Sequence, residues 1–119
     1  DLFPVVATLM AVSQGTSLIK NAARLRLKES DRLSAISQGL KNLGADIEEG
    51  GDYLKITGKD LLKGGEVDGY NDHRIVMALA VLAAKCENGL VINGAQAVEK
   101  SYPNFFEDFK SLGGEAHVI

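Results

Sequence analysis

The residues best able to do chemistry stand together in one short segment, residues 25–32. Its sequence, LRLKESDR, places three cations and two carboxylates within eight residues. An α-helix is expected directly after it, because apolar residues recur at spacings of three and four: Leu33, Ile36, Leu40 and Leu43. We expect this helix to cover about residues 31–43, with Ser30 as its N-cap and Gly44 as its stop. The charged segment therefore lies at a helix N-terminus.

A helix start of this composition can bind an anion. Lys28 and Arg32 are four residues apart, so they point the same way if Lys28 is close to helical geometry. Together with the free backbone N–H groups and the helix dipole, these two cations then form an anion site. The alternative is an ordinary solvated helix start, because charged residues crowd helix ends in many proteins.

The composition suits one domain that binds a small anionic ligand. The 119 residues are 45% hydrophobic and carry a formal net charge of −3, which argues against a nucleic-acid binder. Cys86 is the single cysteine, which excludes an internal disulfide and favours a cytoplasmic location. No apolar run of the sequence reaches membrane-spanning length, and we expect neither a membrane span nor a signal peptide. It opens on Asp1 rather than Met, and we expect a piece of a longer protein.

The segment before residue 28 is expected to hold a helix, a strand and a connector. An almost continuous apolar run predicts a buried helix over residues 3–13, ended by Gly15. A short strand is expected over residues 16–21. Residues 22–27 then form a connector that we expect to be partly extended, because leucines alternate with arginines there.

A β-hairpin is expected after the second helix. Polar and apolar residues alternate over residues 45–49 and 53–57, and Gly50-Gly51-Asp52 between them suits a three-residue loop. A short strand is expected over residues 66–68.

A second apolar run, over residues 75–84, contains no polar residue and predicts another buried helix. Asn71 or Asp72 is its expected cap. The elements expected after it are a strand, a short helix and a last strand, over residues 90–92, 104–112 and 116–119.

The order of these elements predicts an internal repeat, over about residues 1–57 and 66–119. Each half contains a buried helix, a glycine, a strand, a connector, a second helix and a further strand. All four expected helix starts carry charged candidates for a site: Asp1, residues 28–32, Asp72 with Arg74, and Lys100. If the helices pack side by side, the four starts converge on one anionic ligand.

Five sequence blocks, in this order, identify a family. They are DLFP at residues 1–4, GT at 15–16, RLKESDR at 26–32, NDHR at 71–74, and KSYP at 100–103 with FF at 105–106. They resemble the C-terminal part of the 5-enolpyruvylshikimate-3-phosphate synthases, also called 3-phosphoshikimate 1-carboxyvinyltransferases. The resemblance extends from one end of the chain to the other.

The resemblance implies a fold and a reaction. The fold is α/β (α+β), with repeated β-α-β units and mixed sheets around buried helices, as part of one domain of the two-domain enolpyruvyl transferase fold. The reaction moves the enolpyruvyl group of phosphoenolpyruvate to the 5-hydroxyl of shikimate 3-phosphate and releases phosphate. It is a step of aromatic amino-acid biosynthesis, needs no metal or other cofactor, and is the target of glyphosate. The missing N-terminal domain supplies the other side of the cleft, and the chain alone is expected to be inactive.

The resemblance also implies roles for seven residues. Those expected to bind phosphoenolpyruvate are Arg32, Arg74 and Lys100. Lys28 bridges both substrates and assists proton transfer. Arg24 is a candidate for contact with shikimate 3-phosphate, with simple exposure to solvent as the alternative. Asp1 binds hydroxyls of shikimate 3-phosphate and is a candidate base, and Glu29 is the candidate proton donor and acceptor at the methylene carbon. The division of work between the two carboxylates stays open.

Two other functions remain as alternatives. One is the related enolpyruvyl transferase that acts on a UDP-amino sugar, against which residues 28–32 and 100–103 argue. The other is a non-catalytic repeat scaffold, which gives no reason for charges at four helix starts.

Overall fold

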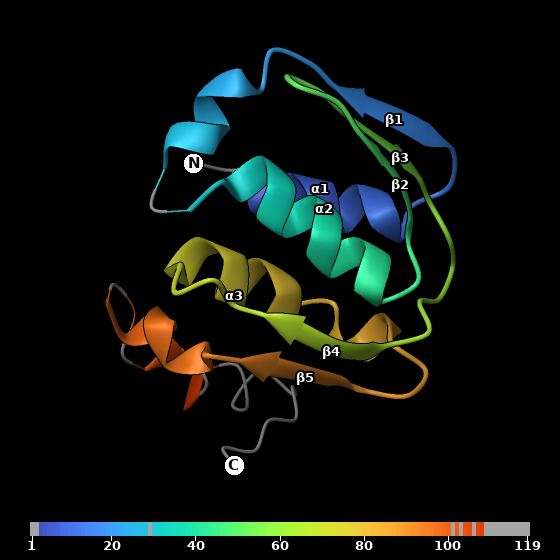
Figure 1. The fold of residues 1–119 in the computed structure, drawn as a ribbon. Helices are drawn as coiled ribbons and strands as arrows, with labels where there is room; N and C mark the ends of the chain where they lie inside the picture. Colours follow the sequence, from blue (N-terminus) through green and yellow to red (C-terminus); the bar gives the residue numbers. More distant parts are fainter. Residues whose placement is uncertain (1–2, 29, 101, 103, 106, 109–119) are drawn as a thin grey trace.

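Three α-helices run side by side and form the centre of the molecule (Figure 1). The computed structural model describes residues 3–28, 30–100, 102, 104, 105, 107 and 108, except for the side chains of residues 99 and 100. The helices are α1 (Phe3–Ala11), α2 (Arg32–Asn42) and α3 (His73–Ala80). All three begin at the same end of the molecule, on the left of the view (Figure 1). Their N-termini therefore face one region.

Two small sheets lie on either side of the helices (Figure 1). The first has the strand order β1-β3-β2, in which β1 (Thr16–Ile19) and β2 (Asp46–Glu49) each pair antiparallel with β3 (Leu54–Thr57). The second pairs β4 (Gly65–Asp68) and β5 (Leu90–Asn93) in parallel. The predicted hairpin and the predicted strands near residues 16, 66 and 90 are therefore confirmed.

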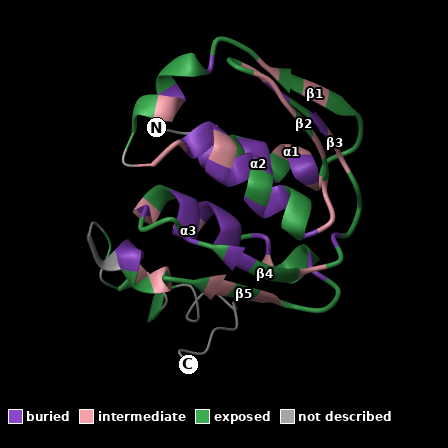
Figure 2. Ribbon diagram, in the orientation of Figure 1, coloured by how far each residue is buried: buried purple, intermediate pink, exposed green. Residues whose placement is uncertain are grey.

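The core lies where α2 meets the other helices and the sheets, as the buried residues show (Figure 2). The apolar face predicted for α2 is confirmed, because four side chains are fully buried: Leu33, Ile36, Leu40 and Leu43. Gly44 follows with a φ of 98°, a left-handed conformation that glycine adopts without strain. The helix therefore ends where the sequence predicts.

The prediction of a buried helix is right for only one face of α1. Ala7, Thr8 and Ala11 are fully buried, whereas Val5, Val6 and Leu9 are between 36% and 56% exposed. Residues at these spacings share a helix face. The molecule therefore carries an exposed apolar stripe on α1. Although α1 is hydrophobic on all sides, only one of its faces is buried.

The second apolar helix ends earlier than predicted. Helix α3 ends at Ala80 rather than near residue 84, and the short 3₁₀-helix η2 (Ala83–Lys85) follows. The Leu82 N–H bonds to Leu79, three residues back, which tightens the last turn. This turn brings Lys85, at the end of η2, to Leu62, whose N–H donates to the Lys85 carbonyl at 2.8 Å.

The connector before α2 is helical, and its predicted partly extended form is wrong. Residues Ala23–Leu27 form the 3₁₀-helix η1. A 3₁₀-helix places residues three apart on one side, so Ala22 and Leu25 are both buried there. Leu27, which an extended chain would place beside Leu25, is 87% exposed. Burial of that small apolar side decides the local conformation.

The last third of the chain is described only in part. A third 3₁₀-helix, η3 (Ala95–Lys100), follows β5. Residues 105, 107 and 108 are helical, within the range of the short helix predicted over residues 104–112. The rest of that helix and the strand predicted over residues 116–119 fall mostly or wholly outside the described residues. The internal repeat stays a prediction.

Candidate functional site

The first turn of α2 is capped by Asp31 and not by Ser30. The Asp31 Oδ1 accepts a hydrogen bond of 3.0 Å from the Ser34 N–H, which satisfies a free donor of the first turn. The Ser30 hydroxyl donates instead to Asp72, at 2.7 Å. The prediction of Ser30 as the cap is wrong because its hydroxyl bonds across to the next helix.

A buried ion pair joins the starts of α2 and α3. Arg32 donates from Nε to Asp72 Oδ2 at 2.9 Å and from Nη2 to Oδ1 at 3.1 Å. The two residues are 5% and 0% exposed. Two parallel bonds of this kind fix the guanidinium plane relative to the carboxylate. The two helix starts are thus held together by a rigid contact.

Asp72 is also the N-cap of α3, which confirms one of the two predicted alternatives, Asn71 or Asp72. Its Oδ1 accepts a hydrogen bond of 3.0 Å from the Arg74 N–H. Burial alone raises the pKa of Asp72, but the hydrogen bonds from Arg32 and Ser30 and the Arg32 charge outweigh it. The resulting pKa is below the ordinary value, so Asp72 is ionised at neutral pH.

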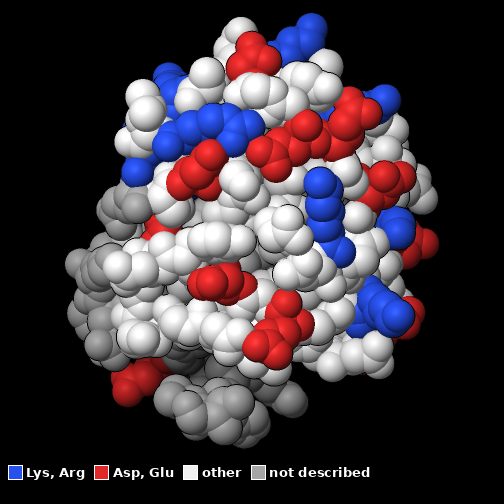
Figure 3. All heavy atoms as spheres, in the orientation of Figure 1, with Lys and Arg blue, Asp and Glu red and all other residues white. Residues whose placement is uncertain are grey.

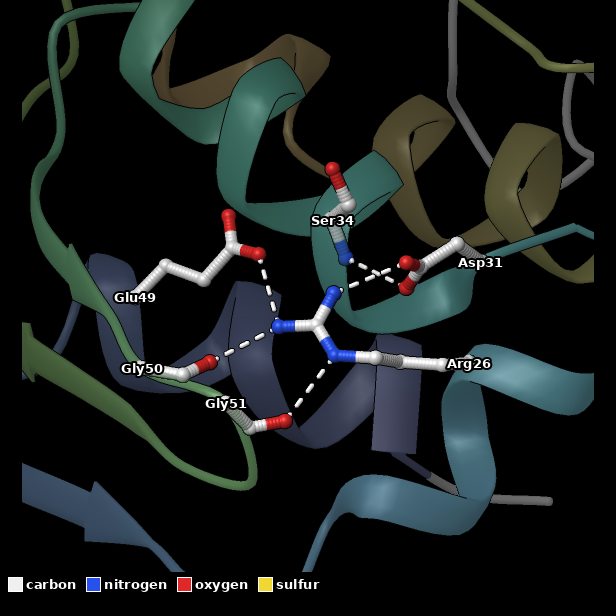
Figure 4. A network of polar contacts seen from close by, with 6 residues as sticks. All are labelled: Arg26, Asp31, Ser34, Glu49, Gly50 and Gly51. Carbon is white, nitrogen blue, oxygen red and sulfur yellow. Dashed lines mark hydrogen bonds and ion pairs between the residues drawn. The ribbon is translucent and has the colours of Figure 1, made fainter.

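A second network, drawn in Figure 4, surrounds Arg26 in η1. Its Nη1 donates to Asp31 Oδ2 at 2.8 Å, and its Nη2 donates to Glu49 Oε2 at 2.9 Å. Nη2 and Nε also donate to the carbonyls of Gly50 and Gly51, at 2.7 and 2.9 Å. The guanidinium therefore connects η1 to the cap of α2 and to the β2–β3 loop. Hydrogen bonds to Asp31 and Glu49 raise its pKa further above the ordinary value.

The structure places the predicted site residues in different surroundings. Lys28, Arg24 and Arg74 are exposed, whereas Arg32 is buried. Lys28 has an extended backbone, with φ −84° and ψ −166°, so the helical geometry on which a shared face with Arg32 depended is not present. Lys100 ends η3, with its side chain outside the described part, and Asp1 and Glu29 also lie outside the described residues.

The described candidate residues are three exposed cations, Arg24, Lys28 and Arg74, which lie near the buried Arg32–Asp72 pair in the sequence. Basic and acidic atoms alternate over η1 and the nearby strands in the upper part of the surface (Figure 3). Arg74 is the second residue of α3 and donates its backbone N–H to Asp72, the carboxylate that binds Arg32, and Lys28 precedes α2 by four residues. Cations beside helix N-termini can hold carboxylate and phosphate groups. Among the described residues, no group of His, Cys, Asp and Glu side chains could hold a metal ion.

A hollow elsewhere on the surface does not coincide with these residues. It has a volume of about 470 Å³ and lies over β1 and the β2–β3 hairpin. Its lining consists of Thr16, Ser17, Leu18, Lys20, Asn21, Glu48, Asp52, Tyr53 and Lys55. None of the predicted site residues is among them. Within the described part of the chain, no helix is long and apolar enough to cross a membrane.

Sequence reasoning predicted Asp72 as a cap but missed its contacts with Ser30 and Arg32, and it gave Arg26 no structural part. The spacing of 40 residues between Arg32 and Asp72 carries no local pattern, and only the packing of α2 on α3 brings them together. Arg26 stood within the recognised RLKESDR block but had no expected partner. The carbonyls that it binds belong to a glycine loop more than twenty residues away. A pairing of that kind follows from the fold alone.

The family model described as EPSP synthase (3-phosphoshikimate 1-carboxyvinyltransferase) matches residues 1–109. Two relatives named 3-phosphoshikimate 1-carboxyvinyltransferase come from Clostridium kluyveri and Clostridium acetobutylicum. They are 59% identical over 115 residues and 54% identical over 117 residues, which is 97% and 98% of this chain. The chain spans about 27% of the length of each relative.

Solved structures agree with the sequence comparisons. Two structures titled EPSP synthase from Acinetobacter baumannii superimpose with TM-scores of 0.87 and 0.90, at 32% and 28% sequence identity. The matches cover 92% and 98% of this chain, and 26% and 27% of those chains. The predicted α/β enolpyruvyl transferase fold is therefore confirmed. By its sequence and its fold, the chain belongs to the EPSP synthase (3-phosphoshikimate 1-carboxyvinyltransferase) family.

Proposed function

We propose that the protein containing this chain transfers the enolpyruvyl group of phosphoenolpyruvate to the 5-hydroxyl of shikimate 3-phosphate, with release of phosphate. The observation that carries the proposal is the rigid joining of two helix starts by Arg32 and Asp72, in a chain of this family. Both substrates are anions, and helix starts bearing exposed cations are suited to hold them. Membership of the EPSP synthase family argues against the UDP-amino sugar as acceptor.

The cations at the helix starts are proposed to bind the substrates. Arg74 and Lys100 hold phosphoenolpyruvate, and Lys28 bridges both substrates. Arg32 takes part in binding phosphoenolpyruvate from a fixed position, because Asp72 holds its guanidinium plane. Arg24, which is exposed on η1, contacts shikimate 3-phosphate.

The carboxylates are proposed to move the protons. Asp1 removes the proton of the 5-hydroxyl, and Glu29 exchanges a proton with the methylene carbon of phosphoenolpyruvate. An addition followed by an elimination needs both transfers, and positioned carboxylates can perform them. The sequence resemblance alone supports these two roles.

The rest of the polypeptide is the proposed partner of this chain. The relatives are almost four times as long as the matched segment, and a cleft closed from both sides excludes water and orients the substrates. Residues 1–119 alone are therefore expected to release no phosphate. We also propose a cytoplasmic location, in keeping with a single, unpaired cysteine.

A chimaera tests the proposed function. Residues 1–119 replace the matching segment of the Clostridium kluyveri relative, and phosphate release is measured with both substrates and with each alone. We expect release that needs both substrates. Arg74→Gln should lower kcat/KM for phosphoenolpyruvate about 10- to 100-fold, the cost of a charge-assisted hydrogen bond.

Lys41→Gln is the matched control, because Lys41 is exposed in the last turn of α2, at the opposite end from the proposed site. It should leave kcat/KM unchanged. An active chimaera in which Arg74→Gln and Lys41→Gln behave alike would contradict the assigned role of Arg74. A folded chimaera that releases no phosphate would contradict the proposed reaction.

A further inference from the structure

We infer that Arg26 is a positioning residue that fixes Lys28 within the proposed site by fastening η1 and the cap of α2 to the β2–β3 loop. The inference rests on the proposed function, to which it adds a residue that touches neither substrate. Its basis is the set of contacts that the Arg26 guanidinium makes with Asp31, which follows Lys28 in the chain, and with β2 and the β2–β3 loop (Figure 4).

The first contact closes the chain around Lys28. Arg26 and Asp31 are five residues apart and are joined by an ion pair of 2.8 Å, with Lys28 between them. Asp31 is itself fixed, because its other carboxylate oxygen caps α2 through Ser34. Both ends of the short segment that carries Lys28 are thus tied together. Such a closure reduces the conformations open to the residues inside it.

The remaining contacts fasten that closed segment to the body of the molecule. Arg26 binds the carbonyls of Gly50 and Gly51 and the carboxylate of Glu49 at the end of β2. The Ala22 N–H, just before η1, donates to the Asp52 carbonyl at 2.7 Å. Three successive carbonyls of the β2–β3 loop therefore hold η1. The hairpin acts as the support against which Lys28 is positioned.

The chemistry of this site requires arginine. A guanidinium directs N–H groups outward in a fixed plane, which lets Nε, Nη1 and Nη2 bind acceptors on different sides. The ammonium of a lysine is a single point charge and cannot reach the Asp31, Glu49 and loop oxygens together.

Because this network is partly exposed, Arg26 is expected to contribute little to stability even where it positions Lys28. The side chains of Arg26, Glu49 and Asp31 are 29%, 24% and 40% exposed, so solvent weakens their ion pairs. Small displacements of a group that binds substrate can nevertheless cost much activity. Loss of Arg26 should therefore affect turnover more than folding.

The test uses the full-length chimaera with three variants. Arg26→Lys keeps the positive charge but removes the planar guanidinium group with its several N–H donors. Glu49→Gln removes one ion pair without altering any tryptic site. Glu48→Gln is the matched control, because Glu48 is the neighbouring residue of β2 and bonds to Tyr53 instead. We measure kcat, KM for each substrate, the melting temperature, and the rate of tryptic cleavage after Lys28 in the native protein.

We expect Arg26→Lys to lower kcat about 10- to 100-fold, as a displaced substrate-binding group does, with little change in melting temperature. Arg26→Lys and Glu49→Gln should both speed cleavage after Lys28 several-fold. Glu48→Gln should change neither kcat nor the rate of this cleavage. A lower melting temperature with unchanged kcat in the folded variants would overturn the inference. That result is expected of an arginine that stabilises the fold without positioning Lys28.

The cleavage experiment separates this inference from the proposed function. If the chimaera releases no phosphate, the proposed function fails, and cleavage after Lys28 still decides whether Arg26 holds the segment. Equal cleavage rates in Glu49→Gln, Arg26→Lys and the unaltered chimaera would overturn the inference whatever the activity.

Discussion

Two ion-pair networks flank the first turn of α2, and they differ chiefly in burial. On one side Arg32 meets Asp72 with almost no exposure to solvent. On the other side Arg26 meets Asp31 and Glu49 with side chains that are 24% to 40% exposed. Both networks tie the helix start to another element, α3 in the first case and the β2–β3 loop in the second. The same residue types thus serve in two different dielectric surroundings.

Burial decides how much stability is lost when an ion pair loses one of its two charges. A charge left alone in the interior is strongly destabilising, because no water replaces its partner. A charge left alone at the surface is solvated again and costs little. We therefore expect the Arg32–Asp72 pair to control stability and the Arg26 network to control geometry. The following variants test that division in urea unfolding of residues 1–119, in order of decreasing effect.

Asp72→Asn should have the largest effect. The amide keeps the size and the capping oxygen of Asp72 but removes the negative charge that faces the buried Arg32 guanidinium, which should cost about 3 to 5 kcal/mol of unfolding free energy. Asp60→Asn is the control at an exposed carboxylate. A loss for Asp72→Asn as small as that of the control would remove the distinction between the two networks.

The effect of Asp72→Asn should depend on pH, because it comes from the charge of the buried carboxylate. The pKa of Asp72 is lowered in the folded state from the ordinary 3.8, so its charge adds stability above that value and loses it as the pH falls through the lowered pKa. The difference in unfolding free energy between the unaltered chain and Asp72→Asn should therefore change little above about pH 5 and narrow as the pH falls below the ordinary value toward the lowered pKa. A difference that stays constant over this range would mean that Asp72 is not charged in the pair.

Asp31 belongs to the exposed network and should show an intermediate effect. Asp31→Ala removes both the cap of α2 and the ion pair with Arg26, for an expected loss of about 1 to 2 kcal/mol. Asp31→Asn keeps a capping oxygen and removes only the ion pair, for a loss under about 0.5 kcal/mol. Equal losses for the two variants would assign the effect to charge and not to capping.

Glu49→Gln should have the smallest effect. We expect a loss under about 0.5 kcal/mol, because the pair with Arg26 is partly exposed. Salt at 1 M should abolish this loss by screening, while the Asp72→Asn loss should persist, because buried charges are screened much less. A Glu49→Gln loss that resists salt would show that the two networks are electrostatically alike.

Local patterns in the sequence predicted most of the fold, and distant pairings had to come from the structure. The spacing of Leu33, Ile36, Leu40 and Leu43 fixed both the presence and the buried face of α2. Alternation predicted the hairpin but misled at residues 22–27, where burial of Ala22 and Leu25 selects a 3₁₀-helix. Local sequence patterns do not predict the conformation of a segment when contacts with a neighbouring element determine it.

The candidate site divides in the same way. The family blocks led to Lys28, Arg32 and Arg74, because such blocks are continuous in the sequence. The cap of α2 was misassigned by one residue, since the bond from Ser30 to Asp72 spans 42 residues. Arg26 had no predicted role, because three of its four acceptors lie on the hairpin.

The sequence separation within the two networks has a consequence for the order of folding. Arg26 and Asp31 are 5 residues apart, whereas Arg32 and Asp72 are 40 apart. The longer loop costs about 2 kcal/mol more in chain entropy to close. We expect the contact of Arg26 with Asp31 to form early and that of Arg32 with Asp72 to form after the rate-limiting step. Asp72→Asn should then speed unfolding far more than it slows refolding.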